Sequence, residues 1–108
     1  MENFDGFSHT EFQSHSLTGV AANYAIPQPS EVTAVLPAGT VLLADELMLN
    51  VPASNLGNVF VDLPGTATVN SLILRPGDSK RISGAPKSTL SALAANAADV
   101  LEVHAFYR

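Results

Sequence analysis

The sequence predicts an all-β protein: a single-domain antiparallel β-sandwich or jelly roll of about eight short strands, with an extended N-terminal arm. Turn signals separate short runs of strand-forming residues roughly every 8–12 residues, which is typical of sandwiches and small barrels. Pro64-Gly65 and Pro76-Gly77 are the clearest signals, because proline cannot donate to a sheet and glycine accepts a positive φ. The length of 108 residues suits one domain. We expect an arm at residues 1–16 and a β-sandwich domain at residues 17–108.

The first 16 residues do not have the pattern of a core strand. They contain three of the five phenylalanines, Phe4, Phe7 and Phe12, among small and polar residues. A disordered terminus is the simplest alternative, but disordered segments are usually poor in aromatic residues. We therefore expect an extended arm whose three rings dock on this subunit or on a neighbour, and Phe4, Phe7 and Phe12 are the hypothetical protein-interface residues.

The sandwich is expected to begin with a strand at residues 17–26, where small side chains on one face allow another layer to approach. The sequence Pro27-Gln28-Pro29 then enforces an extended linker. Residues 31–36 are expected to form a short strand that ends before the Pro37-Ala38-Gly39 turn.

Residues 40–51 form the most apolar segment. A helix is possible, because several leucines fall near helical spacing, but the prolines on either side and the alternation of Leu47, Leu49 and Val51 favour a strand. Further strands are expected at 58–63, 69–75 and 80–83, with a break at Gly84-Ala85-Pro86.

Residues 88–98 compete with an all-β interpretation, because they are rich in alanine and have apolar residues at helical spacing. The segment is short and has no charged pair to support a helix. We expect one helical turn at 88–91, then a short strand and a turn around Asn96. Residues 100–107 alternate as a last strand. Its expected inner face is Leu101, Val103, Ala105 and Tyr107.

The composition argues against nucleic acid and membrane as partners. All five cations lie at or beyond residue 75, and the first 74 residues carry seven carboxylates, so most of the chain repels phosphate. No apolar run approaches the roughly 20 residues that span a bilayer. The chain has no cysteine, which fits folding in a reducing cytoplasm. With 14% charged residues, the surface suits contact with another protein.

No catalytic, cofactor-binding or metal-binding constellation is expected, and we predict that the protein is not an enzyme. His9 and His15 are six residues apart, which matches no usual metal spacing. Glu102 and His104 share a strand face, but no third ligand joins them in the pattern. The sequence also lacks a Gly-x-Ser-x-Gly nucleophile elbow.

An ordered set of short motifs resembles small virion proteins of tailed phages. The motifs are Asn58-Val59-Phe60-Val61, Leu74-Arg75-Pro76-Gly77-Asp78-Ser79, Leu90-Ser91-Ala92-Leu93 and the segment from Asp99 to Val103. The resemblance covers roughly residues 56–107. Members commonly have an aromatic residue where this chain has Ala94.

The resemblance implies a head decoration (cement) protein, made in the host cytoplasm and located in the virion. Such a protein binds the outside of the assembled capsid and stabilises contacts between major capsid subunits. The implied partners are the major capsid protein and further copies of this chain, as a homodimer or homotrimer. The alternative is a virion tail, neck or fibre module that binds a host receptor or glycan. The absence of aromatic residues from the expected loops counts against that alternative.

Overall fold

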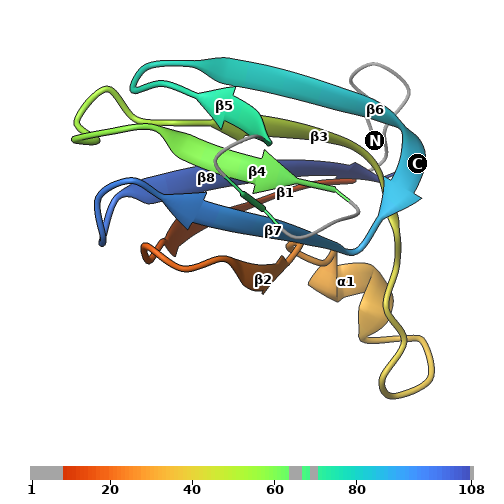
Figure 1. The fold of residues 1–108 in the computed structure, drawn as a ribbon. Coiled ribbons are helices and arrows are strands. Elements are labelled where there is room, and N and C mark those ends of the chain that lie inside the picture. Colours follow the sequence, from red (N-terminus) through yellow and green to blue (C-terminus); the bar gives the residue numbers. More distant parts are fainter. Residues whose placement is uncertain (1–8, 64–66, 69–70, 108) are drawn as a thin grey trace.

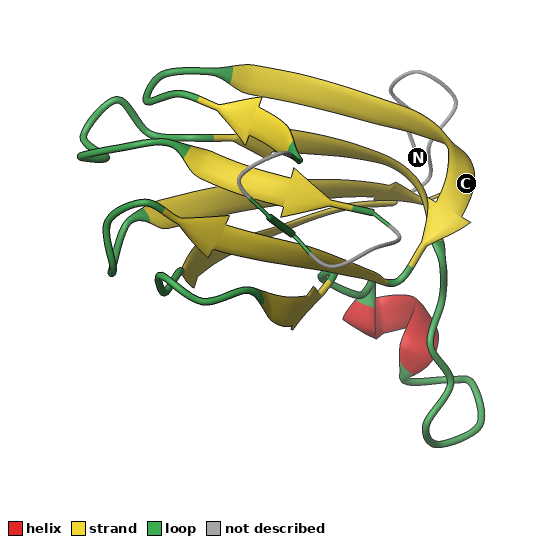
Figure 2. Cartoon of the chain, viewed as in Figure 1, coloured by secondary structure: helices red, strands yellow, loops and turns green. Residues whose placement is uncertain are grey.

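The computed structural model describes residues 9–63, 67–68 and 71–107, with backbone only at 84–87 (Figure 1). Two four-stranded antiparallel sheets form the two layers of a sandwich (Figure 2). The first sheet has the order β1 (His9–Ser16), β8 (Val100–Tyr107), β3 (Ala44–Asn50), β6 (Ser79–Lys87). The second has the order β2 (Ala22–Ala25), β7 (Thr89–Ala94), β4 (Val59–Asp62), β5 (Leu72–Leu74). A four-residue helix, α1 (Ser30–Thr33), lies between β2 and β3.

The pairing of the strands is that of a jelly roll. β1 pairs with β8, β2 with β7, β3 with β6 and β4 with β5. This is the pattern of one long eight-stranded hairpin that has been wrapped into two layers. The predicted all-β class and single antiparallel sandwich are confirmed. The sequence predicts a β-sandwich or a jelly roll, and the strand order is that of a jelly roll.

The core lies between the inner faces of the two sheets. Leu47 and Leu49 of β3 and Leu101 and Val103 of β8 are fully buried, and the second sheet contributes alternate residues such as Val61. The predicted strand at 100–107 matches β8, and its predicted inner face is buried at all four positions. The predicted strand within 40–51 is also confirmed, although it begins only at Ala44.

The Pro76-Gly77 turn has the chemistry that the sequence predicts. Gly77 has a φ of +91°, the Asp78 N–H donates to the Arg75 carbonyl at 2.9 Å, and an Asp78 carboxylate oxygen accepts from the Arg75 N–H at 2.9 Å. Proline before a positive-φ glycine is the sequence of a type II turn. The turn joins β5 of one sheet to β6 of the other. Pro64-Gly65 lies outside the described residues.

The predicted strand at 31–36 is wrong, because residues 30–33 form α1 and the chain then turns. The Pro29 carbonyl accepts from the N–H groups of Val32 and Thr33 at 2.8 and 3.0 Å. These local bonds satisfy backbone groups that a strand would direct to a neighbour.

The predicted break at Gly84-Ala85-Pro86 is also wrong, since β6 continues to Lys87. β6 is an edge strand, where proline is tolerated. The register against β3 shifts between Ala44 and Glu46, so β6 passes this point with extra residues.

The predicted helical turn at 88–91 is absent, and β7 spans Thr89–Ala94. β7 lies between β2 and β4, so pairing on both sides overrides the helical preference of its alanines. The predicted turn around Asn96 is present, with the Asp99 N–H donating to the Asn96 carbonyl at 3.2 Å.

Residues 9–16 of the expected arm form β1 at the edge of the first sheet. All eight residues have register partners in β8. Residues 1–8, with Phe4 and Phe7, lie outside the described residues.

Candidate functional site

The three histidines lie apart, and each has a different environment. His9 lines a small hollow, the His15 ring packs on Tyr24 with centroids 4.9 Å apart, and the His104 ring packs on Phe12. Within the described ranges, no group of three or more His, Cys, Asp or Glu side chains is placed to hold a metal ion.

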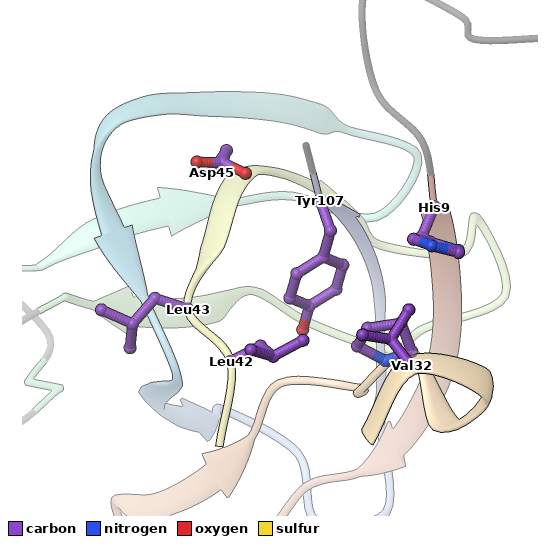
Figure 3. A pocket seen from close by; sticks show the side chains of 7 residues that line it. His9, Val32, Leu42, Leu43, Asp45 and Tyr107 are labelled. Atoms are coloured by element: carbon purple, nitrogen blue, oxygen red, sulfur yellow. The ribbon is translucent and has the colours of Figure 1, made fainter. Parts of the chain in front are cut away.

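The hollow has a volume of about 210 Å³ and lies beside α1 at one end of the sandwich, with the Tyr107 ring at its centre (Figure 3). Its lining residues are His9, Pro29, Val32, Leu42, Leu43, Asp45 and Tyr107. This volume is below the roughly 300–1,000 Å³ of most small-molecule sites. We therefore do not propose the hollow as a ligand-binding site.

The hydroxyl of Tyr107 joins the last strand to the loop after β2. It donates to the Pro27 carbonyl and accepts from Nε2 of Gln28 at 3.2 Å. Burial raises the pKa of Tyr107 to about 12, with smaller contributions from the charges of Glu11 and Asp45. Tyr107 is therefore neutral at ordinary pH, and its role in the hollow is to hold these segments together.

The outer face of the first sheet carries a row of side chains that we call the Phe12 row: Phe12, His104, Met48 and Arg81, from β1, β8, β3 and β6. Register places each opposite the next on the neighbouring strand. The rings of Phe12 and His104 have centroids 4.8 Å apart. Phe12 remains 52% exposed, so the row ends in an uncovered aromatic side chain at the edge of the sheet.

Polar contacts flank the Phe12 row on both sides. Arg81 forms an ion pair with Glu46, and its guanidinium lies 5.1 Å from the centroid of the Phe106 ring. On the other side, Asn50 donates to Glu102 and accepts from Ser79. The face thus combines phenylalanine, methionine and arginine, which are enriched in protein interfaces, with carboxylates, which are depleted there.

A second candidate surface is the protruding segment, residues 30–43, which stands off the sandwich between β2 and β3 (Figure 1). It contains α1 and a tight turn in which Gly39 has a φ of +85° and the Thr40 N–H donates to the Pro37 carbonyl at 3.1 Å. Two aliphatic residues before this turn and two after it have exposed side chains. They are Val35, Leu36, Val41 and Leu43.

The protruding segment is braced at its base. Gln28 forms hydrogen bonds with the backbone of Leu42, and the buried Pro29 precedes α1. Its tip is closed by the Thr40 side chain, which donates to the Pro37 carbonyl at 2.6 Å. A braced loop loses less conformational entropy when a partner covers it, so its apolar side chains are well placed for binding.

The outer face of the second sheet is partly covered by the chain after β4. Ala67 is buried and its N–H donates to Oγ of Ser91 at 2.9 Å. Phe60, which lies on this face, is 9% exposed. This face therefore offers less open aromatic surface than the Phe12 row.

Of the predicted interface residues, the structure describes only Phe12, and it places that side chain on an edge strand. The sequence does not predict the protruding segment, because residues 31–36 are expected to form a strand. Apolar residues precede and follow the Pro37-Ala38-Gly39 turn, but their pattern does not show that they are exposed.

No helix within the described ranges is both long and apolar enough to cross a membrane. No protein-family model matches the chain, and no curated protein resembles it at a significant level.

Proposed function

We propose that this chain is a structural virion protein that binds the outside of an assembled capsid and stabilises contacts between major capsid subunits. The motif resemblance at residues 56–107 suggests this role. The structural observation that carries the proposal is the braced protruding segment, which presents exposed aliphatic side chains at one end of a jelly roll.

Clamping a capsid requires buried contact area rather than a reactive group. Fully burying a valine or leucine side chain contributes roughly 1.5–3 kcal/mol, and stable interfaces bury about 1,200–2,000 Å² in total. Val35 and Val41 are 82% and 60% exposed, so most of this stabilisation is still available to a partner. A homo-oligomer that makes the contact through several subunits at once binds more tightly than one subunit alone.

Phe4, Phe7 and Phe12 remain the proposed contacts of the N-terminal segment with a neighbouring subunit. Because residues 9–16 form β1, a truncation of the whole expected arm would remove a sheet strand. The informative truncation therefore removes residues 1–8. It leaves β1 intact and removes Phe4 and Phe7.

The experiment is co-sedimentation with empty capsids built from the major capsid protein encoded in the same genome. The double variant Val35→Asp/Val41→Asp is expected to lose at least tenfold in affinity, because each carboxylate would be buried without a partner. The matched control is Val20→Asp, whose side chain is 75% exposed in the loop between β1 and β2. Equal binding by the wild type and the double variant would contradict this use of the protruding segment. Binding to host cells instead of capsids would support a receptor-binding module.

A further inference from the structure

Three of the four sheet edges carry features that prevent pairing with another chain. β2 and β5 are only 4 and 3 residues long. β6 is longer, but it contains Pro86 and three cations, and its register shifts near its end. Its Lys80 lies opposite the buried Leu49 and so on the inward side of the sheet. Short strands, proline, bulges and inward charges are the usual protections of an edge.

β1 is less protected. It spans eight residues without proline, lysine or arginine, and its ladder with β8 is regular along its whole length. Its one charged residue, Glu11, lies opposite the buried Ala105 and so on the inward side of the sheet. Among the described strands, only β8 pairs with it. A long, regular edge of this kind is a template for another strand.

We propose that the free edge of β1 pairs with β1 of a second copy, antiparallel about a two-fold axis at Phe12. The resulting homodimer has one continuous sheet across both subunits. Two-fold symmetry is the commonest arrangement of homo-oligomers, and each subunit then contributes the same surface.

The alternation of the strand restricts the register. Residues directly opposite in an antiparallel pair point to the same face, so a shift by one residue would place the outward residues of one copy against the inward residues of the other. The axis must therefore lie where one residue is directly opposite the same residue of the second copy. Phe12 and Gln13 are the two central positions.

The axis at Phe12 is favoured because it brings the two half-exposed Phe12 rings together. The Phe12 row then continues across the interface into the row of the second copy, and aromatic cross-strand pairs stabilise sheets by roughly 0.2–1 kcal/mol. In this register Glu11 lies opposite Gln13 and Thr10 opposite Ser14. No two like charges are directly opposed, although the chain has a net charge of −5.

The dimer is one of the two assemblies that the motif resemblance implies. It forms in the free protein in solution and does not depend on the capsid role. A failure of capsid binding would leave it intact, and a monomeric protein would leave capsid binding intact.

The test is disulfide cross-linking between two single-cysteine variants, which is clean because the chain has no cysteine of its own. Thr10→Cys and Ser14→Cys replace exposed residues and leave Phe12 in place. In the proposed register, position 10 of one copy faces position 14 of the other, and opposed Cα atoms lie about 4.5–5.5 Å apart, within the range of a disulfide. In each variant alone, the two thiols are about 13 Å apart along the ladder.

The mixture of Thr10→Cys and Ser14→Cys is expected to give a cross-linked heterodimer by intact mass, whereas each variant alone stays mainly uncross-linked. A mixture of Thr10→Cys with Ser16→Cys is the matched control, because it reports the register centred on Gln13. Wild-type protein should sediment at about twice the chain mass of 11.3 kDa, and Phe12→Lys should shift it to the monomer with an unchanged circular dichroism spectrum. Preferential cross-linking in the control mixture, or a wild type that is monomeric up to its solubility limit, would overturn the proposal.

Discussion

The side chain of Gln28 forms a pair of hydrogen bonds with the backbone of Leu42. Its Nε2 donates to the Leu42 carbonyl at 2.9 Å, and its Oε1 accepts from the Leu42 N–H at 2.8 Å. The amide thus replaces the backbone partner that a neighbouring strand would supply. It closes the base of the protruding segment, and the same Nε2 also reaches the Tyr107 hydroxyl.

Gln28→Ala should lower the free energy of unfolding by about 1–3 kcal/mol, because it leaves part-buried backbone groups of Leu42 without partners. Hydrogen exchange at the Leu42 amide should accelerate more than exchange in β3. Thr18→Ala serves as the control, since its hydroxyl bonds only within an exposed turn. Unchanged exchange at Leu42 would show that Gln28 does not brace the segment.

Tyr107→Phe should make the free energy of unfolding less dependent on pH between about 10 and 12. The folded protein raises the pKa of Tyr107 from 10.0 to about 12 through burial and the nearby charges of Glu11 and Asp45. The unfolded state therefore loses the proton first, and the stabilisation is complete below pH 10 and is lost as the pH rises towards 12. Urea unfolding at a series of pH values should show this loss in the wild type and a smaller one in the phenylalanine variant. If the free energy of unfolding fell equally with pH in the two proteins, the raised pKa of Tyr107 would not be the cause of the loss.

His15→Phe should reduce the loss of stability at mildly acidic pH. Burial lowers the pKa of His15 below 6.5, while a hydrogen bond with the backbone of Ala25 opposes the shift, and the buried Nε2 has no partner in the described part of the protein. Because the unfolded chain takes up the proton more readily, stability is present above pH 6.5 and declines as the pH falls through the folded-state pKa. Phenylalanine keeps a ring against Tyr24 and removes the titration. A wild type and variant with the same slope of stability against pH would refute this role.

Asp99→Ala should destabilise the end of the sandwich opposite the protruding segment by about 1–3 kcal/mol. The Asp99 carboxylate is 6% exposed and accepts from the N–H groups of Leu56 and Gly57 at 3.1 and 3.0 Å. Asp78→Ala is a suitable comparison, because that carboxylate accepts one N–H in an exposed turn and its loss should cost at most about 1 kcal/mol. Equal destabilisation by the two variants in urea unfolding would contradict the brace at Asp99.

The sequence pattern predicts the central strands well, because burial of one face imposes strict alternation on them. β8 shows this most clearly: its inner residues are apolar at every second position and all are buried. The same argument places the strand in residues 40–51, where the buried Leu47 and Leu49 decide against a helix.

The pattern fails where local hydrogen bonds or an edge position decide the structure. Residues 30–33 form α1 because the Pro29 carbonyl accepts hydrogen bonds from two N–H groups. The alternation of apolar residues gives no sign of these bonds. β6 continues past Pro86 because one side of an edge strand needs no donors. Strand order depends on contacts between residues far apart in the chain, so the jelly-roll order and the exposure of Val35 and Val41 emerge only from the folded structure.

The most direct measurement of the proposed function is the temperature at which capsids release their DNA, followed with a dye, as purified protein is added to capsids that lack it. A clamp on neighbouring subunits should raise that temperature by several degrees, since binding only the assembled state stabilises it. The increase should saturate, and Val35→Asp/Val41→Asp should require a much higher concentration to produce it. A release temperature that is unchanged at every protein concentration would contradict a stabilising role on the capsid.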